Sequence, residues 1–147
     1  MTEQPKVSII TPSYNQARFL EQTMRSVLEQ DYPNLEYIVI DGGSKDGSRE
    51  IIQKYADRLA YWQSQKDKGQ TDAINQGFAR ATGEILAWLN SDDVLYPGAV
   101  SAAVRQLQRH PEVGMVYGNC HWINAEGKVI GDFPAAQTDL KKLRRGY

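Results

Sequence analysis

Short apolar runs alternate along the chain with longer stretches in which apolar residues recur every three or four positions. The short runs are rich in β-branched residues and predict strands, whereas the longer stretches predict amphipathic helices. Strands are expected at residues 6–12, 35–41, 58–64, 84–89 and 112–119, and helices at residues 15–30, 48–56, 71–81 and 97–110. Residues 121–133 predict a β-hairpin turning at Glu126 and Gly127, and residues 138–147 predict the start of a further helix.

Strands that alternate with helices indicate βαβ units joined by right-handed crossovers. The sequence therefore predicts an α/β fold, a mostly parallel central sheet with helices on both faces, followed by a C-terminal β-hairpin. A length of 147 residues suits a single domain with its own core, expected to span residues 1–147. The hydrophobic fraction of 41% and the charged fraction of 24% are ordinary for a soluble globular protein.

The charge pattern narrows the range of partners. A formal net charge of -1 gives no reason to expect nucleic acid or an anionic membrane as a partner. No apolar run approaches the roughly 20 residues needed to span a bilayer, so any membrane association is expected to be peripheral. The N-terminus lacks a signal-peptide layout and Cys120 is the single cysteine, so a cytoplasmic location is expected. The basic residues of the tail predict a solvated helix face or, less commonly, a contact with phosphate or anionic lipid: Lys141, Lys142, Arg144 and Arg145.

Polar residues and glycines follow each of the first four predicted strands. They are the stretches Thr11–Asn15, Asp41–Ser44, Asp67–Gln70 and Asn90–Asp93. Ligands of parallel sheets bind beyond the carboxyl ends of the strands, where such stretches meet. The sequence therefore predicts a binding site at this edge.

Asp92 and Asp93 stand side by side where an apolar run ends. Two adjacent carboxylates repel each other, and a divalent cation would relieve that repulsion. Carboxylate oxygens suit Mg²⁺ or Mn²⁺, and such a metal would neutralise a diphosphate leaving group. The alternative is a solvated turn in which an aspartate caps the next helix.

Other residues at this edge also allow two interpretations. Asp41 could accept a hydrogen bond from a base or ribose, or it could form an Asx-turn. Tyr14 could stack on a base or simply pack against its neighbours. Asn15 is a candidate cap for the first helix, and residues 46–48 are interpreted as turn and cap. Neither a GxGxxG nor a P-loop pattern is present, and no His/Cys spacing matches zinc.

Taken in order, three stretches resemble the family 2 glycosyltransferases of the GT-A fold type over about residues 6–118. VSIITPSYN resembles the opening strand of that family, and SVLEQDYPNLEYIVIDGGSKDGS resembles its first helix, second strand and base-binding aspartate. KGQTDAINQGFARATGEILAWLNSDD resembles the segment that leads into the acidic metal motif. The resemblance implies a nucleotide-sugar donor, with UDP-sugar expected, and Mg²⁺ or Mn²⁺. It also implies transfer of a hexosyl group with inversion to a glycan or lipid-linked acceptor, as in cell-surface polysaccharide biosynthesis.

Carried onto this sequence, the resemblance implies a set of nucleotide-sugar-binding residues: Thr11, Pro12, Tyr14, Asp41, Gly69, Asp72 and Asp92. Asp41 is expected to hold the base and Asp92 to lie against the ribose or diphosphate, and Asp93 is expected to bind the metal. Two positions depart from the family pattern. Asn90 stands where the D-x-D motif often begins with aspartate, and Asp72 lies in DAIN where many members have Ala-Arg-Asn.

The general base of the family lies well after the metal motif and is expected beyond Tyr147. The chain is therefore expected to be the donor-binding portion of a longer enzyme, or a truncated product, and to transfer sugar poorly by itself. A non-catalytic nucleotide-binding or assembly module is the alternative, and an exposed apolar edge could make it a homo-oligomer. A nucleotidyltransferase or an NAD-dependent oxidoreductase is expected to have glycines directly after the first strand. The stretch TPSYNQARF contains none, so both classes are disfavoured.

Overall fold

The computed structural model describes residues 3–135 and contains the expected parallel sheet. Its order is β3-β2-β1-β4, and all three pairings are parallel. The strands are β1 (Val7–Ser13), β2 (Leu35–Asp41), β3 (Tyr61–Ser64) and β4 (Ile85–Trp88). The helices are α1 (Ala17–Leu28), α2 (Ser48–Lys54), α3 (Gln70–Phe78) and α4 (Ala99–Arg109), with a short 3₁₀ helix at Ala56–Arg58. The α/β fold predicted from the alternation of apolar patterns is confirmed.

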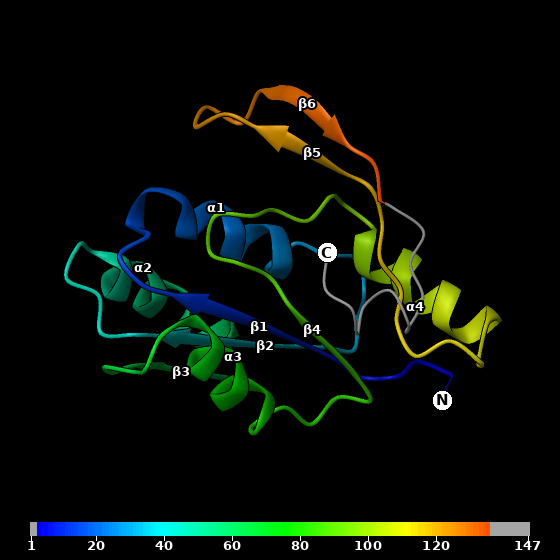
Figure 1. Cartoon of the computed structure of the whole chain (residues 1–147). Coiled ribbons are helices and arrows are strands. Elements are labelled where there is room, and N and C mark those ends of the chain that lie inside the picture. Colours follow the sequence, from blue (N-terminus) through cyan, green and yellow to red (C-terminus); the bar gives the residue numbers. More distant parts are fainter. Residues whose placement is uncertain (1–2, 136–147) are drawn as a thin grey trace.

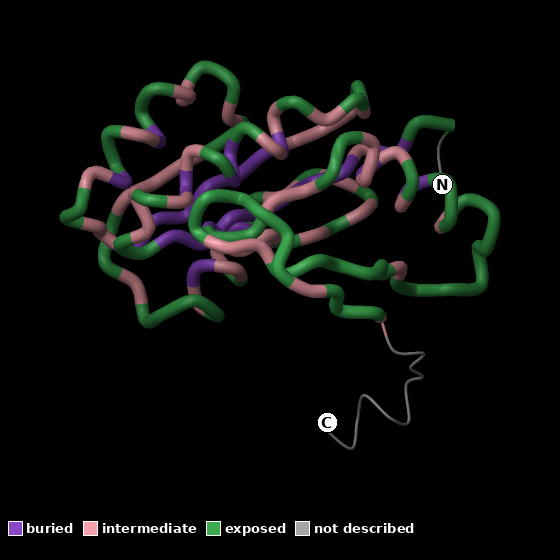
Figure 2. Tube along the Cα trace, turned by 90° about the horizontal axis from the view of Figure 1, so that it is seen from above, coloured by how far each residue is buried: buried purple, intermediate pink, exposed green. Residues whose placement is uncertain are grey.

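Helices cover both faces of the sheet (Figure 1). On one face, Val7, Ile9 and Val39 pack against residues of α1, α2 and α4. On the other face, Ile10 and Ile38 pack against α3. Burial is concentrated in β1 and β2, which Figure 2 shows running through the middle of the molecule. Strands buried on both faces read as continuous apolar runs, which is how these two appear in the sequence.

The N-terminus of α1 is capped by a residue distant in sequence. Asn15 was the expected cap, but it adopts φ 53° and its amide oxygen accepts a hydrogen bond from the backbone of Lys45 instead. The carboxylate of Asp46 accepts a 2.9 Å hydrogen bond from the backbone N–H of Ala17. A second oxygen of Asp46 accepts hydrogen bonds from Ser48 at the start of α2. The cap prediction for Asn15 is therefore wrong, and the interpretation of residues 46–48 as turn and cap is confirmed.

The fifth strand predicted at residues 112–119 does not form. After α4 the chain forms no strand before Cys120, and Val113 and Met115 are 42% and 56% exposed. A cavity of about 640 Å³, lined by Ile85 and Leu86 of β4 on one side and by Val113 and Met115 on the other, separates this segment from the sheet. An apolar run becomes a strand only where a neighbouring edge accepts its hydrogen bonds, and here the segment does not reach that edge.

The hairpin predicted at residues 121–133 is confirmed as β5 (Cys120–Ile123) paired antiparallel with β6 (Val129–Phe133). Gly127 adopts φ 80° in the turn and donates a 2.9 Å hydrogen bond to the carbonyl of Asn124. The hairpin stands apart from the sheet, over α1 and the loop that follows β4 (Figure 1). The helix start predicted at residues 138–147, with its basic residues, lies outside the described residues.

Within residues 3–135, no helix combines the length and the apolar character that crossing a bilayer would demand.

Candidate functional site

The carboxyl ends of the four parallel strands border one cavity of about 800 Å³. The segments after all four strands contribute to its walls, as the sequence predicts for this edge. The lining residues are Pro12, Ser13, Tyr14, Gln16, Gly42, Gly43, Lys45, Lys66, Asp67, Gly69, Gln70, Ala73, Asn90, Ser91 and Asp92. We call this space the donor-side cavity.

The structure brings some of the expected binding residues to this cavity and leaves others outside it. Pro12, Tyr14, Gly69 and Asp92 lie in its walls, and Tyr14 is 65% exposed, so that its ring is open to stacking. Thr11, Asp41 and Asp72 are not among the lining residues.

The side chains outside the lining have partners within the protein. The hydroxyl of Thr11 is buried and lies 2.9 Å from the hydroxyl of Tyr37. Asp72 accepts hydrogen bonds from the backbone of Lys68 and from the side chain of Gln76. Thr11 thus bonds another side chain in the core, whereas Asp72 also holds the backbone just before α3.

Asp41 organises the glycine loop that follows β2. Its side chain is fully buried, and one oxygen accepts hydrogen bonds from the backbone N–H groups of Gly43 (3.1 Å) and Ser44 (2.9 Å) and from the hydroxyl of Ser64 (2.6 Å). The other oxygen accepts a hydrogen bond from the hydroxyl of Ser44. These contacts match the Asx-turn interpretation and hold Gly42 and Gly43 in the wall of the donor-side cavity.

Ser13 carries a buried hydroxyl that has no hydrogen-bond partner within the described part of the chain. The residue is 4% exposed and lines the donor-side cavity between Pro12 and Tyr14. Leaving a buried hydroxyl unpaired costs about 1–3 kcal/mol, and either an ordered water or a ligand in the cavity would satisfy it. No pattern in the sequence singles out Ser13 for binding, and its position between two expected binding residues is the one available signal.

Asn90 connects the acidic pair to the start of α3. Its amide oxygen accepts a 2.8 Å hydrogen bond from Gln70, and its amide nitrogen donates a 3.1 Å hydrogen bond to the carboxylate of Asp93. Burial raises the pKa of the Asp93 carboxyl above its ordinary value, the negative charge of Asp92 raises it further, and the hydrogen bond from Asn90 opposes both. At the position where the family often has aspartate, Asn90 thus orients Asp93 without adding negative charge.

Polar side chains of α1 and of the turn that follows it hold the loop that carries the acidic pair. Thr23 donates a 2.7 Å hydrogen bond to the carbonyl of Asp93, and the hydroxyl of Ser26 accepts a 3.1 Å hydrogen bond from the backbone of Leu95. Gln30 donates a 2.9 Å hydrogen bond to the carbonyl of Tyr96. Sequence reasoning missed these positioning residues. Their signal is three polar side chains at helical spacing within residues 15–30, the stretch that the sequence predicts as a helix.

The acidic pair fits a metal that is shared with a ligand. Among residues 3–135 there is no group of three or more His, Cys, Asp or Glu side chains placed to hold an ion. Mg²⁺ is commonly bound by one or two carboxylates together with substrate phosphates, which is what Asp92 and Asp93 can offer.

The model of the family described as Glycosyl transferase family 2 matches residues 8–140. The chain belongs to this family. The family 2 resemblance inferred from the strand ends is thereby confirmed, and so is the GT-A type of fold, since the solved structures that it matches are glycosyltransferases.

Curated relatives of this family 2 chain are considerably longer than it is. An uncharacterized glycosyltransferase of Mycobacterium tuberculosis is 42% identical over 120 residues, which cover 80% of this chain and 46% of the relative. The GalNAc(5)-diNAcBac-PP-undecaprenol beta-1,3-glucosyltransferase of Campylobacter jejuni is 35% identical over 133 residues, which cover 88% of this chain and 42% of the relative. The family 2 chain thus spans less than half the length of either relative.

Two solved glycosyltransferases share its architecture. The mannosyltransferase PcManGT from Pyrobaculum calidifontis, in complex with GDP-Man and Mn²⁺, matches with a TM-score of 0.66 and 32% identity, covering 72% of this chain and 33% of that one. S. aureus TarS in complex with UDP-GlcNAc matches with a TM-score of 0.66 and 26% identity, covering 72% of this chain and 32% of that one.

Proposed function

We propose that this chain is the donor-binding part of a metal-dependent glycosyltransferase and binds a nucleoside-diphosphate sugar in the donor-side cavity. The cavity of about 800 Å³ at the carboxyl ends of the four parallel strands carries the proposal, because ligands of parallel sheets bind at this edge and its walls contain Lys45, Lys66 and Asp92. Family membership supports it, as do the nucleotide sugars bound to the two solved relatives. We further propose that residues 1–147 form a single domain of a longer enzyme.

The side chains around the cavity suit the parts of such a donor. The exposed ring of Tyr14 offers a stacking surface for a base, and the glycine loop held by Asp41 lets the ligand approach the backbone. Lys45 and Lys66 lie in the same walls and suit a negatively charged diphosphate. We assign Asp92 to the ribose or diphosphate and Asp93 to Mg²⁺ or Mn²⁺.

In the proposed reaction, an acceptor hydroxyl oxygen forms a bond to the anomeric carbon of the donor sugar from the face opposite the diphosphate. The bond from that carbon to the diphosphate oxygen breaks, the nucleoside diphosphate leaves with the electron pair, and the hydroxyl proton passes to a general base. Configuration at the anomeric carbon is inverted. A bound divalent metal supplies positive charge that stabilises the leaving diphosphate. Asn90 and Thr23 take no part in the bond changes, and their role is to orient Asp93.

We further propose a UDP-sugar as donor and a glycan or lipid-linked sugar as acceptor, in the cytoplasm and in a pathway of cell-surface polysaccharide synthesis. The lipid-linked alternative is supported by the Campylobacter relative, whose name includes an undecaprenol-linked oligosaccharide.

Calorimetric titration of UDP, GDP and TDP, with and without Mn²⁺, tests the proposal on the wild-type chain, on Asp93→Asn and on Asp57→Asn. Asp57 is an exposed aspartate of the 3₁₀ helix and serves as the matched control. We expect Mn²⁺-dependent binding of UDP that weakens at least about tenfold in Asp93→Asn, ~1.4 kcal/mol, and is unchanged in Asp57→Asn. If no nucleotide binds under any of these conditions, the proposed donor site is wrong.

A further inference from the structure

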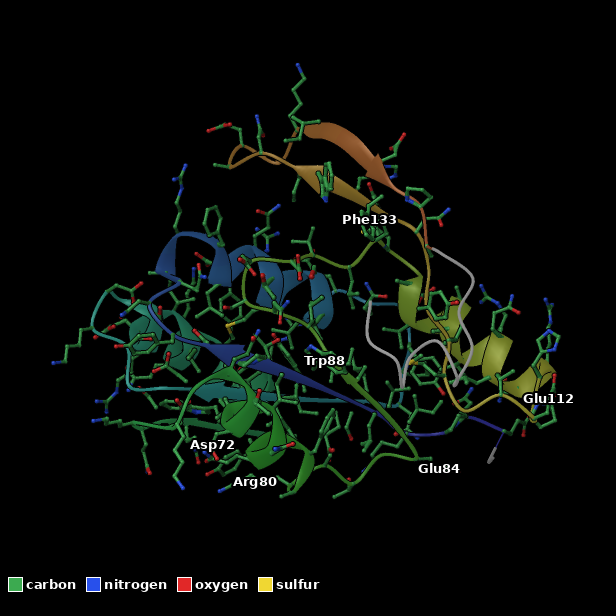
Figure 3. All side chains as sticks on the ribbon, viewed as in Figure 1. Asp72, Arg80, Glu84, Trp88, Glu112 and Phe133 are labelled. Atoms are coloured by element: carbon green, nitrogen blue, oxygen red, sulfur yellow. The ribbon has the colours of Figure 1, made fainter. Side chains whose placement is uncertain are left out.

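Two hydrogen bonds in series join the start of α3 to the candidate metal ligand. The side-chain nitrogen of Gln70 donates a 2.8 Å hydrogen bond to the amide oxygen of Asn90, and the amide nitrogen of Asn90 donates a 3.1 Å hydrogen bond to Oδ2 of Asp93. Figure 3 labels Asp72 on α3 and Trp88 on β4, the two elements whose ends this series connects. Gln70 and Asn90 both line the donor-side cavity. The connection therefore runs along the wall of the proposed nucleotide site.

Packing against the sheet fixes α3 and, with it, the position of Gln70. Ala73 is buried with Ile10 and Ile38, which face α3 from β1 and β2. Gly77 lies so close to β1 that an added Cβ would come within 2.5 Å of a side-chain carbon of Ile10. Gln70 is the first residue of this helix. Its side chain is thus presented by a packed element rather than by a free loop.

The orientation of the Asn90 amide decides what the Asp93 carboxylate meets. A side-chain amide carries an acceptor oxygen and a donor nitrogen, and half a turn about its last bond exchanges them. If the oxygen faced Asp93, two acceptors would repel each other. The donor from Gln70 occupies that oxygen and so keeps the nitrogen on the side of Asp93. Hydrogen bonds in series also polarise one another, which strengthens the bond that reaches the carboxylate.

Two further contacts of Asp93 act on its main chain. Its backbone N–H donates a 3.1 Å hydrogen bond to the carbonyl of Asn90, and its own carbonyl accepts one from Thr23. These bonds place the Cα atom but leave the side chain free to change its rotamer. The bond from the Asn90 amide acts on the carboxylate itself. Whatever fixes that amide therefore fixes the orientation in which Asp93 presents its oxygens.

We propose that Gln70 is a positioning residue for the metal site: through the Asn90 amide, it holds the Asp93 carboxylate in one orientation before a divalent ion binds. Gln70 itself makes no contact with the ion. This role rests on the proposed function, because it takes Asp93 as a metal ligand. Removing a group that orients a metal ligand by hydrogen bonding typically lowers metal affinity by about 10- to 100-fold.

A direct contact between Gln70 and the nucleotide would be a different role with a different signature. Such a contact would contribute to nucleotide binding whether or not a metal is present. A positioning role contributes only through the metal. Its loss should therefore be seen with Mn²⁺ and should vanish when EDTA removes the metal.

Nucleotide titrations on the full 147-residue chain separate these two roles. UDP, GDP and TDP are titrated calorimetrically with Mn²⁺, and their affinities in EDTA are measured by saturation-transfer difference NMR. The test variant is Gln70→Met, because methionine has nearly the same length and no donor, and the exposed position opens no cavity in the core. The matched control is Gln53→Met, at an exposed position of α2 outside the donor-side cavity.

We expect Gln70→Met to weaken Mn²⁺-dependent nucleotide binding about tenfold, to leave binding in EDTA unchanged and to keep the wild-type urea midpoint. Gln53→Met should match the wild type in all three measurements. A double-mutant cycle with Asn90→Ala identifies the path of the effect. Once the Asn90 amide is gone, Gln70→Met should cause no further loss of affinity.

Three results would overturn the inference: unchanged Mn²⁺-dependent binding in Gln70→Met, an equal loss of affinity with and without the metal, or losses that add in the cycle with Asn90→Ala. Each of these leaves the proposed donor site standing, because the wild-type chain binds nucleotide with Mn²⁺ in all of them. Absence of nucleotide binding by the wild-type chain would instead overturn the proposed function, and the positioning role with it.

Discussion

The hydroxyl of Thr23 donates a 2.7 Å hydrogen bond to the backbone carbonyl of Asp93, 70 positions further along the chain. Thr23 is buried on α1, which is packed against the sheet through Leu20, Met24 and Val27. The candidate metal ligand is thus held by a rigid helix as well as by its own loop. Sites whose side chains are fixed by packed elements keep their geometry more closely than sites carried by loops alone.

Replacing Thr23 with valine keeps the shape of the side chain and removes the donor. We expect Thr23→Val to lower the free energy of unfolding by about 1 kcal/mol, the net value of one hydrogen bond, and to weaken Mn²⁺-dependent UDP binding. Urea denaturation and calorimetry measure the two effects. Thr23→Ser retains the hydroxyl and should restore both. A loss in the serine variant without a loss in the valine variant would mean that packing by the methyl group, rather than the hydrogen bond, holds the loop.

Ser13→Ala should separate stability from binding. The hydroxyl has no partner in the protein, so its removal should leave the free energy of unfolding unchanged or raise it by up to about 1 kcal/mol. Nucleotide affinity should fall, because the ligand loses its hydrogen bond. Ser101→Ala is the control, since that hydroxyl has a partner in Asp31 at 2.7 Å and lies away from the donor-side cavity. A destabilised Ser13→Ala with unchanged nucleotide affinity would contradict the assignment.

Asp41→Asn should act mainly on stability. Its carboxylate accepts hydrogen bonds from two backbone N–H groups and two serine hydroxyls, and an amide nitrogen placed among these donors cannot accept from them. We expect the free energy of unfolding to fall by about 2–3 kcal/mol, measured by urea denaturation, with Asp57→Asn unchanged. Wild-type stability combined with weakened UDP binding would instead show that Asp41 acts on the base directly.

Glu36 should make stability depend on pH. Burial by itself raises the pKa of Glu36, but hydrogen bonds from Ser8 and Thr82 outweigh it and hold the pKa below its ordinary value of 4.5. A carboxyl with a lowered folded-state pKa stabilises the protein above its unfolded-state pKa, and this stability is lost as the pH falls through the folded-state value.

The difference in unfolding free energy between wild type and Glu36→Gln should therefore be largest near neutral pH and shrink below about pH 4. Urea titrations across this range measure it, with the exposed Glu126→Gln as control. If the difference instead stays constant down to acid pH, the charge of Glu36 is not what stabilises its contacts with Ser8 and Thr82.

Much of the site could be anticipated because it depends on local pattern. The apolar runs mark β1 and β2, and in a parallel sheet the residues after each strand must meet at one edge, so Tyr14 and Asp92 arrive at the same cavity. The strand predicted at residues 112–119 does not form, and the local sequence pattern gives no indication of this. Whether an apolar run becomes a strand depends on an edge within hydrogen-bonding distance, and that edge belongs to a distant part of the chain.

The sequence by itself determined the alternation of strands and helices, the parallel sheet and the edge at which polar residues gather, because burial periodicity and turn residues are local properties. Only the tertiary structure decided what each polar side chain touches. Thr11 and Ser13 lie two positions apart on β1, yet one hydroxyl meets Tyr37 of β2 and the other meets no partner among the described residues. The physical reason is that hydrogen-bond partners are set by which elements pack together, and packing joins residues that the sequence keeps far apart.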